Sequence, residues 1–129
     1  MNASGTVDPT LNGDTGLNDT TPGQVHFGDY HPVGAVNMLP STGQILIAGS
    51  EVDNNLNYGT GLVRLNGNGT ADNSFGSFGT AIYAFPLSGG NNAMANAIPV
   101  DSGFHILLAG YATVGTSAHS AFAAVRFTS

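Results

Sequence analysis

An internal repeat is the feature that most constrains the fold of this 129-residue chain. "GQILIAGS" at 43–50 recurs as "FHILLAGY" 61 residues later, and "GLVRLN" at 61–66 recurs as "AAVRFT" 62 residues later. "SGTVDPTLNG" at 4–13 resembles "NGTADNSFGS" at 68–77, an offset of 64. Three collinear similarities predict a single domain of two copies of one unit, at about 1–66 and about 67–129.

Each copy contains four short segments with the composition of β-strands. They are rich in valine, isoleucine, leucine and phenylalanine, and glycine, proline, asparagine or serine bounds them. No stretch keeps a helical period. The expected strands are 23–27, 34–39, 44–50 and 61–66 in the first copy, and 80–85, 95–100, 105–111 and 121–127 in the second. The pattern therefore predicts an all-β fold of two tandem four-stranded antiparallel β-propeller-like blades.

The third strand of each copy is its most continuously apolar segment, which is typical of a buried strand. We therefore expect its isoleucine and leucine side chains in the core, with one alanine per copy where strands approach closely. These residues are Ile45, Ile47, Ile106 and Leu108, with Ala48 and Ala109 as the alanines.

The charge of the chain excludes several classes of partner. Two arginines and no lysine stand against eight acidic residues, for a net charge of −6. Binding to nucleic acid or to anionic membrane surfaces needs clustered basic residues, so we expect neither. No apolar run approaches the length of a membrane helix. With no cysteine, the chain has neither a disulfide framework nor a thiolate metal site.

The two arginines occupy the same place in the two copies. In "GLVRLN", Leu62 and Arg64 lie on one face of the expected strand because side chains alternate. The turn that follows returns the chain and places Asp72 eight residues on, where its carboxylate can accept a bidentate contact from Arg64. The alternative is a solvated arginine on an open strand.

The segments "PSTGQILIAG" and "GLVRLNGNGTADNSFGSFG" resemble the bacterial delta-60 repeat family. The resemblance covers essentially the whole chain and implies propeller-like arrays, often in large surface or exported proteins, with no known catalytic residues. Gln44, His105 and Leu11 depart from the family pattern. The matching positions are Gly43, Ile45, Ala48, Gly49, Arg64, Leu65, Gly69, Asp72, Phe75 and Gly76, and then Ile106, Ala109, Gly110, Arg126 and Phe127 with Gly5 and Asp8.

The second arginine suggests how the chain assembles. The turn that would hold a partner for Arg126 has its counterpart at 4–13, where Asp8 takes the place of Asp72. Closing this junction within two blades would bend the array too sharply. We therefore expect Asp8 of one copy to lie beside Arg126 of another, in a head-to-tail contact that forms a ring or a filament.

The sequence carries weak candidates for ligand sites. Asp14, Asn18 and Asp19 lie in an insertion and could bind calcium, but a plain Asn/Asp turn accounts for them better, since their spacing is not that of an EF-hand. The loop with Glu51 and Asp53 is similar. The histidines do not predict a zinc site, and no nucleophile motif predicts an enzyme. We expect no metal and no other cofactor. The histidines are His26, His31, His105 and His119.

Two blades leave exposed edges and apolar faces, so we expect the chain to be either a piece of a longer array or a subunit that assembles with copies of itself. We favour the second, in a non-enzymatic structural or interaction protein. The alternative is a carbohydrate-binding, lectin-like propeller built from several chains, because tyrosine rings can stack on sugars. A surface rich in asparagine, threonine, serine and glycine favours an extracellular or cell-surface location, although the first ten residues do not form a signal peptide. The tyrosines are Tyr30, Tyr58, Tyr83 and Tyr111.

Overall fold

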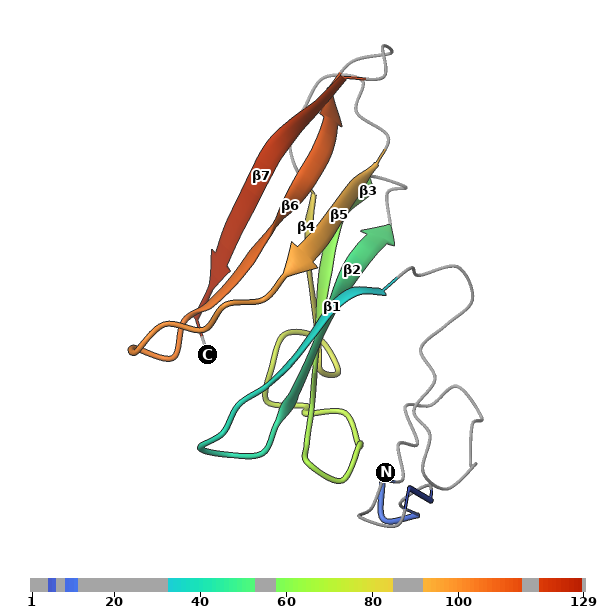
Figure 1. Ribbon diagram of the computed structural model, residues 1–129, viewed down its shortest axis with the longest axis vertical. Coiled ribbons are helices and arrows are strands. Elements are labelled where there is room, and N and C mark those ends of the chain that lie inside the picture. Colours follow the sequence, from blue (N-terminus) through green and yellow to red (C-terminus); the bar gives the residue numbers. More distant parts are fainter. Residues whose placement is uncertain are drawn as a thin grey trace.

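Two antiparallel sheets make up the described part of the chain, which contains no helix (Figure 1). The computed structural model describes residues 5–6, 9–11, 33–52, 58–84, 92–114 and 119–128. The first sheet has the order β1 (Val33–Met38), β2 (Ile45–Val52), β3 (Tyr58–Leu65), β4 (Thr80–Ala84). The second has the order β5 (Ala93–Ala97), β6 (Ile106–Val114), β7 (His119–Phe127). Consequently no bilayer-spanning helix occurs within the described ranges.

The hairpins form where the sequence supplies turn residues. Between β1 and β2, the N–H of Gly43 donates to the Leu39 carbonyl over 2.8 Å, and Gly43 has a φ of 71°. Glycine enters this left-handed region without a steric penalty. Between β5 and β6, the Asp101 side chain accepts hydrogen bonds from the N–H groups of Gly103 and His105.

The segment at 80–85 joins a different sheet from the one expected. We predicted it as the first strand of the second unit, but β4 pairs with β3, with Val63 opposite Thr80 and Gly59 opposite Ala84. The chain returns directly beside β3 because Arg64 donates its N–H to Gly79 and accepts from the N–H of Asp72. The first sheet therefore extends beyond residue 66 to Ala84, and the strand expected at 23–27 lies outside the described residues.

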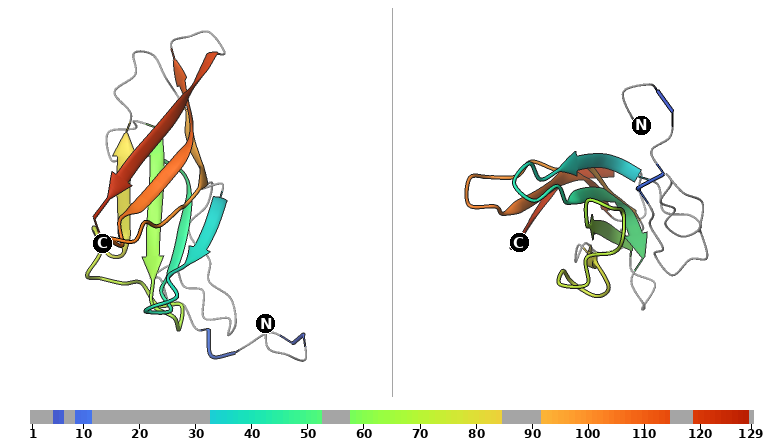
Figure 2. Two further views of the ribbon diagram at one scale, coloured as in Figure 1. Left: turned by 60° about the vertical axis from the view of Figure 1, so that its left-hand side comes forward. Right: turned by 90° about the horizontal axis from the view of Figure 1, so that it is seen from below.

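The two sheets pack face to face, and the strands of one run obliquely across those of the other (Figure 2). β5 lies against β1, β2 and β3 of the first sheet. Burial of apolar side chains between two sheets is the main source of stability in such an arrangement. The core between them contains Leu39, Leu46, Ala48, Leu62 and Phe75 from the first sheet and its loops, with Ala95, Ile98, Ile106 and Leu108 from the second sheet and the turn that follows β5.

The two copies of the apolar strand bury opposite faces. Ile106 and Leu108 are fully buried, as expected, but Ile45 and Ile47 at the equivalent positions are only half-buried. The packed face of β2 carries Leu46 instead. The expectation was wrong for these two isoleucines because the second sheet covers only one face of the first. Ala48 is buried as expected, whereas Ala109 is half-buried for the same reason.

This difference predicts unequal effects of matched substitutions. Ile106→Ala should lower the free energy of unfolding by about 2–5 kcal/mol, because it leaves a cavity in a closed core. Ile45→Ala should cost clearly less, because its side chain already contacts solvent. Urea unfolding of the two variants measures both values, and equal losses would contradict the assignment of the packed faces.

Candidate functional site

A buried ion pair organises the turn between β3 and β4. Arg64 on β3 is only 7% exposed, and its Nε lies 2.9 Å from Oδ2 of Asp72. This is the partner that the sequence analysis assigned to Arg64. The contact is not bidentate, because Ser74 Oγ donates to the second oxygen, Oδ1, over 2.6 Å. Nη2 of Arg64 donates instead to Ser74 Oγ, over 3.2 Å.

The Asp72 carboxylate is fully engaged by hydrogen-bond donors. Oδ1 accepts from both the N–H and the hydroxyl of Ser74, and Oδ2 accepts from Arg64 and from Nε2 of Gln44. The hydrogen bond from the Ser74 hydroxyl is the main cause that holds the pKa of Asp72 below its usual range. The Ser74 N–H and the charge of Arg64 lower this pKa further, against the opposing effect of burial.

Phe75 connects this turn to the second sheet. The guanidinium of Arg64 lies over the Phe75 ring, 4.6 Å from its centroid, in a cation–π contact. The same ring meets Phe127 of β7 edge to face, with the centroids 6.4 Å apart. Phe75 is therefore a structural contact between the sheets. The sequence shows that Phe75 belongs to the repeat pattern, but it does not show the contact between Phe75 and Phe127.

Removing the Asp72 carboxylate tests how much the ion pair with Arg64 contributes to stability. Asp72→Ala should lower the free energy of unfolding by about 3–5 kcal/mol, because it leaves Arg64 buried without a counter-charge. Asn73→Ala, at the exposed neighbouring position, serves as the control and should change stability little. Urea unfolding measures both, and a small loss for Asp72→Ala would show that the pair does not hold the turn.

The lowered pKa of Asp72 also predicts an acid sensitivity. Because the unfolded carboxyl binds its proton first, at a pKa of about 3.9, the pair stabilises the fold fully above that pH and less as the pH falls through the folded pKa. The free energy of unfolding should therefore fall with acid more steeply in the original protein than in Asp72→Asn. The pKa of Asp101 is also lowered, chiefly by the N–H of His105, but this contribution is common to both proteins and cancels. Parallel pH profiles would contradict the prediction.

Arg126 lies in a different environment from Arg64. It is exposed on β7, opposite Leu107 of β6. Among the described residues it has no ion pair or side-chain hydrogen bond. The partner expected for it, Asp8, lies outside the described residues, so the contact between these two residues stays a prediction.

The candidate ligands that the structure describes do not come together as a metal site. No group of three or more potential metal ligands occurs within the described ranges. His105 Nδ1 instead lies 2.9 Å from Oδ2 of Asp101, within one hairpin turn. His119 begins β7 and is exposed. Several candidates lie outside the described residues: Asp14, Asn18, Asp19, His26, His31 and Asp53.

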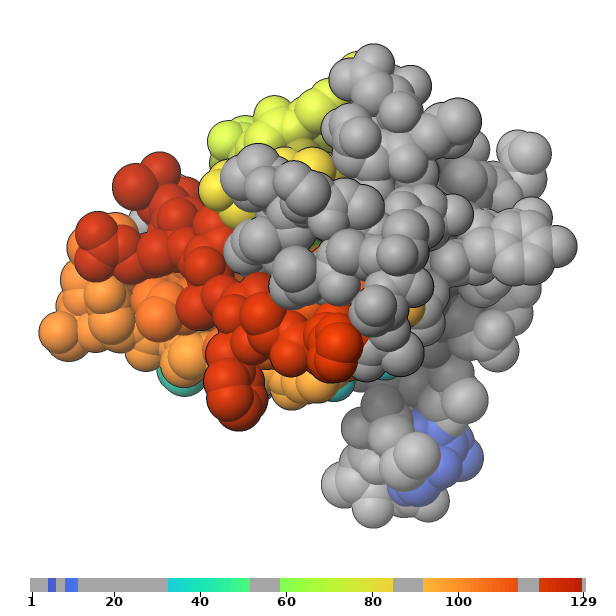
Figure 3. Space-filling model, turned by 90° about the horizontal axis from the view of Figure 1, so that it is seen from above, coloured from blue at the N-terminus to red at the C-terminus, as the bar shows by residue number. Residues whose placement is uncertain are grey.

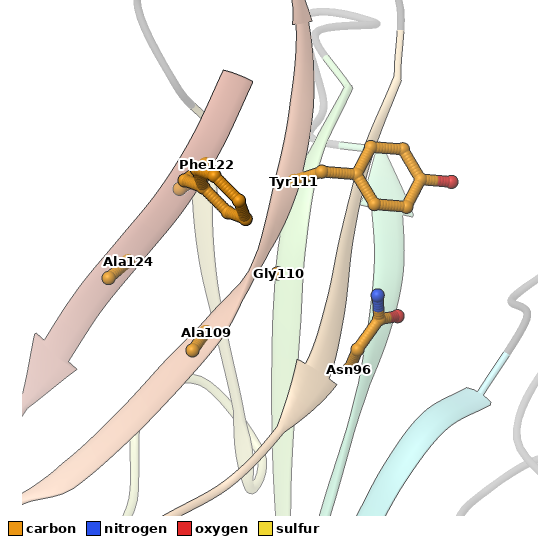
Figure 4. A pocket seen from close by; sticks show the side chains of 7 residues that line it. Asn96, Ala109, Gly110, Tyr111, Phe122 and Ala124 are labelled. Atoms are coloured by element: carbon orange, nitrogen blue, oxygen red, sulfur yellow. The ribbon is translucent and has the colours of Figure 1, made fainter. Parts of the chain in front are cut away.

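A shallow hollow lies on the face of the second sheet that points away from the first (Figure 4). Tyr111 of β6 and Phe122 of β7 are directly opposite each other, and alanines form the floor beside them. Asn96 of β5 supplies an amide at the border, and Phe122 is fully exposed. The sequence analysis had noted Tyr111 but not Phe122. Strand alternation and the repeat register could have placed the two rings on the same face of the second sheet. They could not have shown that this face is open.

The comparisons with known proteins support a propeller-type repeat. Residues 41–75 match a family described as a domain of unknown function (DUF5122) with a beta-propeller fold. This segment spans β2, β3 and the turn that contains Asp72. The comparison with curated proteins gives no match, and neither does the comparison with solved structures.

Proposed function

We propose that this protein is a non-enzymatic structural or interaction module that assembles head to tail with copies of itself at the bacterial surface or exterior. The observation that carries the proposal is the open edge of the second sheet. Among the described residues this sheet has three strands where the first has four, and β7 forms its edge. An unpaired edge strand is a ready template for pairing with another chain. Figure 3 shows that β7, in red, forms part of the molecular surface.

The repeat supports a specific completion of this sheet. In the first sheet, β3 is followed by the turn with Asp72 and then by β4. The counterparts of that turn and strand are residues 4–13 and 23–27. Supplied by another copy, they would place Asp8 beside Arg126 and make a second four-stranded blade of a propeller-like array. The resemblance to the delta-60 repeat, often found in exported proteins, supports the same arrangement.

Charge exchange tests the assembly. Sedimentation velocity and negative-stain imaging should show closed rings or filaments for the original protein. Asp8→Arg should block assembly because it sets two positive charges together, and adding Arg126→Asp should restore it at least in part. A protein that stays monomeric over a wide concentration range would overturn the proposal. Normal assembly of Asp8→Arg would overturn the pairing alone.

A second candidate function is carbohydrate binding, and the hollow beside Tyr111 and Phe122 supports it. Aromatic rings next to an amide, here Asn96, can stack on a sugar and hydrogen-bond its hydroxyl groups. Binding on a glycan array that is lost in Phe122→Ala, but kept in a matched variant of exposed Phe104, would support this function. No binding by the single chain, in which this hollow is open, would count against it.

A further inference from the structure

The two sheets have equivalent strand pairs in the same register. β2 matches β6 at an offset of 61, and β3 matches β7 at an offset of 62. Leu46 lies opposite Arg64 in the first sheet, and Leu107 lies opposite Arg126 in the second. β1 and β5 also match, because each has an irregularity at the same place relative to its neighbour, at Gly34 and at Asn96. Residues of β1, β2 and β3 therefore have definite counterparts in β5 with the turn after it, β6 and β7.

The counterparts of the buried face of the first sheet form the open face of the second. The face of the first sheet that packs on the second carries Leu46, Ala48, Leu62 and Arg64, and all four are buried. Their counterparts Leu107, Ala109, Ala124 and Arg126 lie on the side that points away from the first sheet, where all are half-buried or exposed.

The reverse holds for the other face. The second sheet, with the turn after β5, packs Ile98, Ile106 and Leu108 against the first. The counterparts of these residues are Val36, Ile45 and Ile47, on the outer side of the first sheet. Ile98 is 6% exposed, whereas Val36 is 63% exposed. The two sheets thus form one interface with each other. The equivalents of the two packed faces are the two outer faces, one on each sheet, and these are open.

We infer that the outer face of β6 and β7 in one copy receives the outer face of β1, β2 and β3 in the next copy, in the manner of the internal packing. This inference rests on the proposed head-to-tail assembly and names the surfaces that carry it. The two faces differ, so the contact is heterologous, and each added copy leaves one free face for the next. The Asp8–Arg126 contact lies at the same junction.

Two differences distinguish this contact from the internal one. Tyr111 and Phe122 replace Ser50 and Thr60, so the contact between copies gains two aromatic rings, of which Phe122 is fully exposed in the single chain. At the inner strands, a Cβ added to Gly34 would lie 1.9 Å from the Ala95 carbonyl oxygen, which shows how closely β1 approaches β5 there. Asn96 stands in place of Gly34 at the new contact. Because an asparagine side chain needs more room than glycine, β5 of one copy and β1 of the next lie farther apart than β1 and β5 of the same chain do.

Complementary variants test the inference. Val36→Asp places a negative charge on the first-sheet face, and Ala124→Asp places one of the same sign on the second-sheet face, so that the two altered faces also repel each other. Each variant alone should associate about a hundredfold or more weakly than the original protein, because a buried unpaired charge costs several kcal/mol. Each keeps one intact face, so an equimolar mixture should form a one-to-one dimer and nothing larger by sedimentation velocity. Phe78→Lys changes an exposed aromatic residue on the turn before β4 and should assemble normally.

The outcomes separate this inference from the proposed function. If the original protein assembles and both face variants assemble equally well, the function stands and the assignment of these faces is wrong. Self-association of one variant alone would also overturn it, because that would indicate a contact between two identical faces. If the original protein does not assemble, both fail. Thermal unfolding confirms that the variants fold, and Met38→Asp and Phe122→Asp repeat the test on the same faces.

Discussion

The buried pair of Arg64 and Asp72 is the interaction on which the arrangement of the chain depends. It closes the turn after β3, so that the chain returns beside β3 and β4 completes the first sheet. The same turn carries Phe75 into the space between the sheets, against Phe127. Burying a charge pair is favourable only where further contacts satisfy it, and here Ser74 and Gln44 donate to the Asp72 carboxylate while the guanidinium of Arg64 lies over the Phe75 ring.

Strand alternation explains how one repeated unit can bury different residues in its two copies. Each strand offers apolar side chains on both faces, since valine, isoleucine and leucine occupy adjacent positions. The described residues form two sheets, and each sheet covers one face of the other and leaves its own second face open. A unit of this kind cannot satisfy both faces alone, which is the general reason why such units occur in arrays. The proposed assembly follows from this unsatisfied half of the packing.

The buried and exposed groups of the described residues are consistent with the proposed assembly role. The strongest polar cluster, around Asp72, is buried and internally saturated, so its groups are engaged in holding a turn. Large apolar side chains are also exposed: Val36 and Met38 on one outer face and Phe122 on the other. Exposed apolar surface of this kind marks sites of contact with other molecules.

The sequence by itself determined the repeat, the positions of most strands and the partner of Arg64, because these depend on local composition, alternation and short-range turns. It did not determine that β4 belongs to the first sheet, since an apolar segment such as 80–85 can pair with either neighbour. Nor did it show that Ile45 and Ile47 lie on an outer face while Ile106 and Leu108 lie in the core. Equivalent residues have the same local preferences. Only the tertiary packing of one sheet on the other, a long-range event, decides which face of each is removed from water.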